Sequence, residues 1–340
     1  MQNAELSHKV GASEGLRSRA PVFVVGCPRS GTTLLYHMLL SAGNFAMYRA
    51  ESQVFNVLEP RFGDLSVANH RRKLLRAWCG STLFAKTSLD AADVEKRIMG
   101  ECRNGGDFLR IVMEAMSRQQ NVERWADSTP EHLLYLDRIK ATIPDALAIH
   151  IIRDGRDVAL SLQKQGWIHP FPWDRAKSLE VAALYWEWIV REGRKCGESL
   201  GGDYVEVRYE DLVENPRDVL ARLSHFVGQD LDYDRIEKIG VGSMSNPNSS
   251  FSAEIEAGEF TPMARWKNLD AQQLSGLEGL IGETLGELGY SRQSPGVPRT
   301  TRDSLARMRS IYHWYFSLKL RLKKETPLGQ VFASRDLSWV

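Results

Sequence analysis

The sequence has little net charge and no long apolar runs. Its 44 Lys and Arg residues nearly balance its 43 Asp and Glu residues, which leaves a formal net charge of +1. A chain without a global positive field is not drawn onto DNA or RNA, so we expect no nucleic-acid partner. No window approaches the run of about 18 apolar residues that a transmembrane helix needs. We therefore expect no membrane-spanning helix.

Cysteine is also scarce, and the four cysteines are widely separated. They form no CxxC pair and no Cys/His spacing typical of zinc, so we expect neither a disulfide framework nor a metal site. Residues 1–20 are polar and lack the apolar segment of a signal peptide. These absences favour the cytoplasm, with the inner face of the membrane as a second location. Internal repeats are absent too, which excludes a solenoid.

Apolar, β-branched segments alternate with helical patterns along the chain. Strands are predicted at 21–26, 146–152 and 204–209, each followed by a helical pattern, and residues 64–124 are mostly helical by pattern. Such alternation is typical of a parallel sheet covered by helices on both faces. We therefore predict an α/β fold with three layers, in which helices flank a central parallel sheet.

The segment FVVGCPRSGTTLL, at residues 23–35, has the outline of a phosphate-binding loop, with Gly26 and Gly31 at the usual separation. A nucleoside triphosphatase would place lysine where Thr32 stands, to reach the outer phosphates. The helix that follows still offers free amides and a positive dipole end to an anion, and Arg29 adds a fork of donors. The loop is therefore either a degenerate Walker A loop of a nucleotide kinase or triphosphatase, or an intact loop for another donor.

A second charged turn follows the predicted strand at 146–152, in the sequence IIRDGRDVALSL. Arg153 stands at the carboxyl end of this strand, and Ser161 stands in the helix that follows. The side chains of Arg153 and Arg156 can form an anion site here. They can also form a solvated turn with neighbouring aspartates.

The segment PRSGTTLL, at residues 28–35, matches the 5′-phosphosulfate loop P-[KR]-[ST]-G-[TS]-[TS]-x-L throughout. Over residues 20–290 the chain resembles the sulfotransferase superfamily, above all its bacterial and protein-tyrosine sulfotransferase branch. The resemblance implies a P-loop-like fold and the donor 3′-phosphoadenosine 5′-phosphosulfate, which is released as 3′-phosphoadenosine 5′-phosphate. It also implies in-line transfer of the sulfuryl group to an acceptor hydroxyl, without a metal.

The resemblance assigns two anchors to the donor, one on each βα unit. The loop holds the 5′-phosphosulfate, and Arg153 with Ser161 holds the 3′-phosphate. Tyr209 lies near the adenine and Arg265 in a loop that closes over the nucleotide, although core packing and a surface loop are the alternatives for these two. The donor-binding residues implied in this way are Arg29, Ser30, Gly31, Thr32, Thr33, Arg153, Ser161, Tyr209 and Arg265, with Ser250 as a further candidate.

Catalysis needs a base for the acceptor proton and positive charge on the leaving phosphate. The resemblance implies Arg29 for the charge and Glu51 for the base. A carboxylate is an adequate base for an alcohol only with a raised pKa or a late proton transfer, so we expect Glu51 to be buried near the donor. A solvent-facing glutamate at a helix start is the alternative for Glu51. His37 is a second candidate base, although its helix face favours a packed core histidine.

Two segments are predicted near the acceptor. In WADSTPEHLLYL, at residues 125–136, Ser128 replaces a lysine common in the family, while His132 is a candidate acceptor contact. In QGWIHPFPWD, at residues 165–174, the aromatic residues suit sugars, phenols and lipids alike. Trp167 is the acceptor candidate in this second segment, with Phe171 and Trp173 beside it. The acceptor hydroxyl then belongs to a carbohydrate, a glycolipid, a small natural product or a peptide tyrosine.

The chain divides into three parts by pattern. Residues 1–20 are predicted as a loose leader, 21–292 as the sulfotransferase domain, and 293–340 as a basic, aromatic helical tail. The tail segment 302–324 can pack on the domain or on another subunit, or it can lie on an anionic membrane surface. The pattern makes no prediction about oligomeric state.

Overall fold

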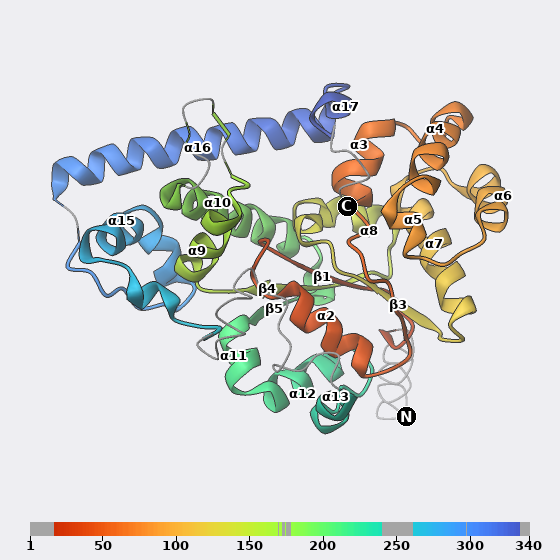
Figure 1. The fold of residues 1–340 in the computed structure, drawn as a ribbon, viewed down its shortest axis with the longest axis horizontal. Helices are drawn as coiled ribbons and strands as arrows, with labels where there is room; N and C mark the ends of the chain where they lie inside the picture. Colours follow the sequence, from red (N-terminus) through yellow and green to blue (C-terminus); the bar gives the residue numbers. More distant parts are fainter. Residues whose placement is uncertain are drawn as a thin grey trace, which may run out of the picture.

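Five parallel strands form a central sheet in the order β2-β3-β1-β4-β5 (Figure 1). This computed structural model describes residues 17–168, 170–171, 174, 178–239, 261–296 and 298–333. The strands are β1 Val22–Gly26, β2 Phe45–Ala46, β3 Arg124–Asp127, β4 Leu147–Ile152 and β5 Tyr204–Arg208. The predicted α/β fold with a central parallel sheet is confirmed.

Side chains of the central strand β1 alternate between two separate cores. Val22 and Val24 face one core, which is covered by α2 (Thr32–Ser41), α11 (Tyr209–Glu214), α12 (Pro216–Val227) and α13 (Tyr233–Ile239). Phe23 and Val25 face the larger core, which contains α7 (Gly105–Gln119), α9 (Gly155–Gln165) and α10 (Leu179–Glu198). This alternation is the period of a strand, and an apolar residue at every position means that both faces are covered. Figure 1 shows the two helical layers on either side of the sheet.

The helices are α2 Thr32–Ser41, α3 Glu59–Phe62, α4 Ala68–Cys79, α5 Thr82–Ala85, α6 Ala91–Glu101, α7 Gly105–Gln119, α8 Leu136–Thr142, α9 Gly155–Gln165, α10 Leu179–Glu198, α11 Tyr209–Glu214, α12 Pro216–Val227, α13 Tyr233–Ile239, α15 Ala271–Glu287, α16 Arg299–Glu325 and α17 Gly329–Phe332, with the short helices η1 Val54–Leu58, η2 Pro130–Tyr135, η3 Gly201–Asp203 and η4 Arg265–Asn268.

Strand pairing positions the predicted phosphate loop. Gly26, the last residue of β1, pairs with Ile151 near the end of β4. The loop after β1 and the turn after β4 therefore leave the same edge of the sheet side by side. In open parallel sheets this edge, at the carboxyl ends of the strands, is where ligands bind.

The long helix α16 lies across α10 and α15 (Figure 1). Tyr312 and Phe316 on its inner face are buried, and the Trp188 indole on α10 donates to Ser317 Oγ over 2.9 Å. The tail segment 302–324 thus packs on the domain, which was one of the three possibilities given for it. Of the described helices, none is both long enough and apolar enough to cross a membrane.

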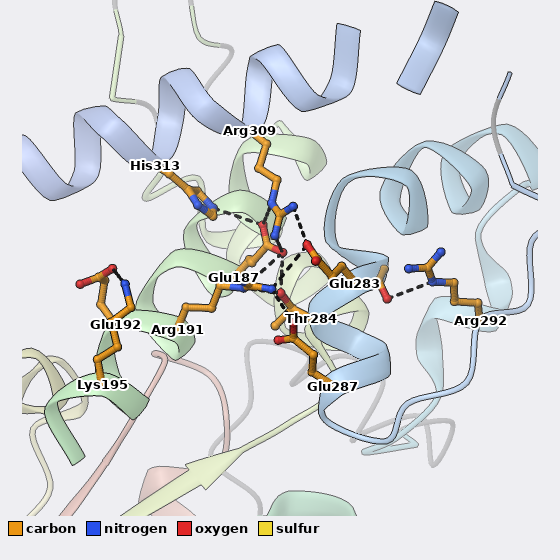
Figure 2. Close-up of polar contacts among 11 residues, drawn as sticks. Glu187, Arg191, Glu192, Lys195, Glu283, Thr284, Glu287, Arg292, Arg309 and His313 are labelled. Atoms are coloured by element: carbon orange, nitrogen blue, oxygen red, sulfur yellow. Dashed lines mark hydrogen bonds and ion pairs between the residues drawn. The ribbon is translucent and has the colours of Figure 1, made fainter. Parts of the chain in front are cut away.

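A buried carboxylate on α10 holds α16 in place (Figure 2). Glu187 is fully buried, and it accepts from Arg309 Nε over 2.7 Å and from Thr284 Oγ1 over 2.6 Å. His313 Nε2 lies 3.2 Å from the same carboxylate. Burial disfavours the charged carboxylate, but the contacts with His313, Thr284 and Arg309 outweigh it and lower the pKa of Glu187.

Two expectations about the ends of the domain remain predictions. The boundary between a domain at 21–292 and a tail at 293–340 is one, and the leader at 1–20 is the other. Within that leader, Arg17 is held by the body of the protein, because its guanidinium donates to Phe226 O and to Gly202 O over 2.9 Å each.

Candidate functional site

The phosphate loop has the backbone of an anion site. Arg29 has a φ of 75° and Gly31 a φ of 102°, and the Ser30 amide donates to Cys27 O over 3.0 Å. The helix α2 begins directly after the loop, at Thr32, and no side chain within the described residues caps its first amides. These amides and the dipole of α2 therefore remain available to an anion.

Gly31 is required at its position by both its backbone angle and its surroundings. A Cβ atom on Gly31 would lie 2.3 Å from Cδ2 of the Tyr209 ring. That distance is far below van der Waals contact, and the positive φ disfavours any L-residue. The close approach brings the Tyr209 ring, at the start of α11, against the backbone of the loop.

The two predicted anchors meet in the structure. Arg29 Nε donates to Ser161 Oγ over 3.2 Å, across 132 residues of sequence. Arg153 Nη1 donates to the carbonyl of Arg29 over 3.2 Å, and the Arg153 guanidinium lies 4.4 Å from the centre of the Tyr209 ring. Four of the residues that the sequence implied for the donor are therefore joined by a chain of contacts.

Arg265 joins this group from the other end of the chain. Its Nη2 donates to the carbonyl of Asp157 over 3.3 Å, and the Asp157 carboxylate accepts from the amides of Ala264 and Trp266 over 2.8 and 3.1 Å. Asp157 thus ties η4 to α9. The sequence indicated Arg265 but gave no sign of Asp157, because its partners lie more than a hundred positions away.

The electrostatics of the group favour an anion. Burial, followed by repulsion from Arg153, lowers the pKa of Arg29, although Glu51 opposes the shift. Burial lowers the pKa of Arg265 to about 10, with repulsion from Arg153 and Arg29 adding to it and Asp157 opposing it. Like charges in a partly desolvated site repel, so a bound anion would relieve both effects.

Glu51 lies on the open side of the site. Its side chain is exposed, so the expected burial is absent and the structure differs from the prediction here. The charge of Glu51 opposes the lowered pKa of Arg29, which indicates that the two side chains are near each other. Gln53 Nε2 donates to the Glu51 carboxylate. His37, the second candidate base, is half-buried, and burial followed by repulsion from Arg49 lowers its pKa.

A polar chain runs inward from Glu51. Gln53 has a φ of 55° and precedes the π-helix η1. Asn56 Nδ2 donates to Gln53 Oε1 and, over 3.0 Å, to Glu131 Oε2, while Tyr185 OH donates to Glu131 Oε1 over 3.0 Å. The sequence did not indicate Gln53, Asn56 or Glu131 as functional residues. The only available signal was that Gln53 and Asn56 lie in the same short segment as Glu51.

His132 lies in a second polar chain and is completely buried. Its Nδ1 lies 2.9 Å from Asp127 Oδ2, and its Nε2 accepts from the Phe55 amide over 3.2 Å. Because Nε2 accepts, Nδ1 carries the proton and donates to Asp127. Burial opposes ionisation, but His132 together with hydrogen bonds from Ser52 and Thr129 lowers the pKa of Asp127. The predicted acceptor contact of His132 has no support in this geometry, which instead fixes the backbone at 52–55.

Three described residues of the aromatic segment, Trp167, Ile168 and Pro170, line a cavity of about 320 Å³. Trp167 lines it and is 52% exposed. The Phe171 ring packs on the α16 rings Tyr312 and Tyr315, with centroids 5.2 and 4.6 Å apart. Two other candidates, Trp173 and Ser250, lie outside the described residues.

Arg156 has a structural role. It is 2% exposed, pairs with Asp154 over 2.7 Å and also contacts Glu278. Its guanidinium stacks 3.6 Å from the centre of the Trp266 ring. The interpretation of this arginine as part of a solvated turn is therefore wrong. In the part of the chain that is described, no three His, Cys, Asp or Glu side chains come together in a way that could hold a metal ion.

Comparison with known proteins identifies the family. Residues 21–233 match the sulfotransferase family. The chain belongs to this family. This match confirms the predicted enzyme class and the predicted resemblance to the sulfotransferases.

Several individual proteins are similar to this sulfotransferase. Nodulation protein NoeE of Sinorhizobium fredii (strain NBRC 101917 / NGR234) is 23% identical over 337 residues, which cover 90% of this chain and 76% of NoeE. The sulfotransferase domain from the Synechococcus PCC 7002 olefin synthase is 19% identical, with 85% of this chain and 94% of that chain covered and a TM-score of 0.49. The sulfotransferase domain from the curacin biosynthetic pathway is 18% identical, with 86% and 97% covered and a TM-score of 0.47. The family assignment rests on the match over 21–233 and not on these structures.

Proposed function

We propose that this sulfotransferase transfers a sulfuryl group from 3′-phosphoadenosine 5′-phosphosulfate to an acceptor hydroxyl. The observation that supports this donor is the meeting of the two anchors, in which Arg29 contacts Ser161 and Arg153 contacts the Arg29 carbonyl. A ligand with a single phosphate would need only the loop. A donor with phosphates at both ends of its ribose would use both anchors.

Buried polar atoms in the site fit such a donor. Ser30 is 1% exposed and Arg153 is 7% exposed, yet among the described residues neither Ser30 Oγ nor Arg153 Nε has a hydrogen-bond partner. A buried donor group without a partner costs about 1–3 kcal/mol. Phosphate oxygens would supply the missing acceptors, and the uncapped amides of α2 would supply further donors to them.

Each residue of the site then has a distinct task. Arg29, with the amides and hydroxyls at 30–33, holds the 5′-phosphosulfate, and Arg153 with Ser161 holds the 3′-phosphate. Tyr209 contacts the nucleotide beside Arg153, and Arg265 covers it. When bound, the donor supplies a sulfuryl group whose bond to the bridging phosphate oxygen breaks as the acceptor oxygen attacks in line. Arg29 stabilises the charge that then develops on the leaving phosphate.

Glu51 takes the proton of the acceptor hydroxyl. The carboxylate is exposed in the structure, so the environment that raises its basicity must come from the bound substrates, which exclude water from it. Gln53 orients the carboxylate through its hydrogen bond. No metal is needed in this scheme, because Arg29 and the helix amides supply the positive charge.

The acceptor lies on the side of Glu51 and Trp167. Its hydroxyl belongs to a carbohydrate, a glycolipid or a small natural product, since an exposed aromatic face such as that of Trp167 binds all three. The buried His132 supports this side by fixing the segment that carries Glu51.

Ligand stabilisation tests the donor. Purified protein is heated with 3′-phosphoadenosine 5′-phosphate in the presence of a chelator and, separately, with ATP and magnesium. A ligand at 100 times its Kd adds about 2.7 kcal/mol to folding, so we expect a clear rise of Tm with the first ligand only. Stabilisation by ATP with magnesium alone would instead establish the alternative, a nucleotide kinase or triphosphatase with a degenerate Walker A loop.

Two variants test the catalytic roles. Arg29→Ala and Glu51→Gln should each lower the rate of transfer from labelled donor by about a hundredfold or more. Glu51→Gln should leave stabilisation by 3′-phosphoadenosine 5′-phosphate nearly unchanged. Matched controls are Arg72→Ala and Glu123→Gln, which remove the same charges from exposed positions. Full activity of the Glu51 variant would remove this residue from the mechanism.

A further inference from the structure

The cavity beside Trp167 has an aromatic wall that α16 completes. Its volume of about 320 Å³ is at the lower end of the range for small-molecule sites. Aromatic and apolar side chains from three segments line it, namely Trp167, Ile168, Tyr185, Trp188, Tyr315 and Phe316. Such a surface suits a flat or chain-like apolar body.

Charged side chains of opposite sign lie on different walls of this cavity. Lys319 and Lys323 come from α16 and Glu131 comes from η2. The two lysines are four positions apart and therefore lie on one face of the helix. An amphiphilic ligand with an anionic group would direct that group toward the lysines and away from the Glu131 carboxylate. A ligand hydroxyl could donate to Glu131 instead.

Glu131 connects the cavity to the candidate catalytic segment. Asn56 donates both to Glu131 and to Gln53, which in turn donates to Glu51. On the other side, Glu131 adds to the effect of burial in raising the pKa of the Cys27 thiol, so its charge also reaches the phosphate loop. Glu131 therefore lines the cavity and also belongs to the surroundings of the candidate base Glu51 and of the phosphate loop.

The wall formed by α16 lies outside the part of the chain that the family model matches. The family match ends at residue 233, whereas α16 spans Arg299–Glu325. Acceptor specificity that depends on Lys319 and Lys323 thus comes from a part of the chain outside the family match.

We propose that this cavity is the acceptor site and that it takes an amphiphile with an apolar or aromatic body, an anionic group and a hydroxyl. Lys319 and Lys323 bind the anionic group, and the hydroxyl end passes the Glu131 wall toward Glu51, which takes its proton. Asn56 and Gln53 connect these two carboxylates by hydrogen bonds. This inference rests on the proposed function, because it assigns the acceptor of the same transfer reaction.

Calorimetric titration with three matched probes tests the site. Decanoate, decanol and decyltrimethylammonium share the same chain and differ in head group. We expect decanoate to bind more tightly than the cationic probe, and Lys319→Ala/Lys323→Ala to weaken decanoate binding by about fivefold, which corresponds to about 1 kcal/mol for a partly exposed charge pair. Binding of decanol should not change in this variant.

The control variant is Arg307→Ala/Arg321→Ala, which removes the same charge from exposed positions of α16 that do not line the cavity. It should bind decanoate like the wild type. Three outcomes would each overturn the proposal. The two double variants could lose decanoate affinity equally, or the wild type could bind the anionic and cationic probes equally. The third outcome is binding to anionic vesicles without binding of soluble decanoate. Leu320→Trp fills the cavity from α16, and it should abolish binding of decanoate and decanol alike.

Stabilisation by 3′-phosphoadenosine 5′-phosphate is measured on the same samples. If it persists while decanoate does not bind, the acceptor inference alone fails. If it is absent while decanoate binding depends on the lysines, the proposed donor fails and the cavity loses its role as an acceptor site.

Discussion

Replacing Gly31 by alanine tests whether the phosphate loop and Tyr209 form one unit. An added Cβ would lie 2.3 Å from Tyr209 Cδ2, at a φ of 102°. A left-handed backbone costs an L-residue about 1–2 kcal/mol, and forcing an extra carbon into a packed site costs about 1–3 kcal/mol. We therefore expect Gly31→Ala to lower the free energy of unfolding by about 2–5 kcal/mol.

Gly43 provides a matched control. Its φ is 85°, but a Cβ there would have no atom within 4 Å. Gly43→Ala should therefore cost only the backbone part, about 1–2 kcal/mol. It should also keep full stabilisation by 3′-phosphoadenosine 5′-phosphate. Gly31→Ala should lose this stabilisation, because a displaced Tyr209 ring no longer supports the Arg153 guanidinium stacked on it.

Urea unfolding of a double-mutant cycle isolates the contact. If the clash with the ring causes the difference, Gly31→Ala should cost about 1–3 kcal/mol less in a Tyr209→Ala background. Strict additivity in the cycle would refute the reasoning. Equal destabilisation by Gly31→Ala and Gly43→Ala would refute it as well.

Three further changes probe other parts of the protein. Glu187→Ala should destabilise the fold by about 3 kcal/mol in urea unfolding, since a buried ion pair loses one partner. The pKa of Glu187 is lower in the folded protein than its ordinary value of 4.5. The carboxylate therefore makes its full contribution to the free energy of unfolding above pH 4.5 and loses it as the pH falls through the folded pKa. The stability of the variant should accordingly depend less on pH below 4.5. Gln53→Leu should lower kcat by about tenfold with little effect on donor binding if Gln53 orients Glu51, and an unchanged kcat would argue against that role. Arg153→Lys keeps the charge but loses the stacking on Tyr209 and the fork of donors, so titration should show donor affinity reduced by about tenfold.

Strands β1, β4 and β5 could be predicted from the sequence, whereas β2 and β3 could not. β1 is apolar up to Gly26 and β4 is apolar apart from the buried His150, because both faces of these strands are covered. β2 has only two residues, and β3 carries the buried polar residues Arg124 and Asp127. Arg124 Nε and Nη1 donate to the carbonyls of Ala20 and Val227, about a hundred positions away. No local pattern indicates that pairing.

The same contrast holds for the site. The loop residues at 28–35 form a contiguous motif, so their grouping could be predicted from the sequence. Gln53 and Glu131 act through a chain of hydrogen bonds that joins positions 75 residues apart. The sequence left burial and exposure of Glu51 as alternatives, because the outcome depends on which elements pack above residue 51. The sequence therefore indicated that the loop lies beside Arg153 and Ser161, but it did not indicate the hydrogen-bonded chain from Glu51 to Glu131.

Backbone strain gives independent support for the position of the site. Outside glycine and asparagine, the described residues with positive φ are Arg29, Gln53, Ser88 and Ala264. Asparagine adopts this conformation readily, but other residues lose about 1–3 kcal/mol and need surroundings that hold them there. Arg153 holds the carbonyl of Arg29, and Asp157 holds the amide of Ala264.

Three of these four strained positions adjoin the residues assigned to the donor and the base. Arg29 belongs to the loop, Ala264 precedes Arg265, and Gln53 contacts Glu51. Each segment comes from a different part of the chain, so no single local sequence feature explains all three. The fold therefore maintains backbone strain in three separate segments around the candidate site. A requirement for fixed geometry during sulfuryl transfer accounts for this strain.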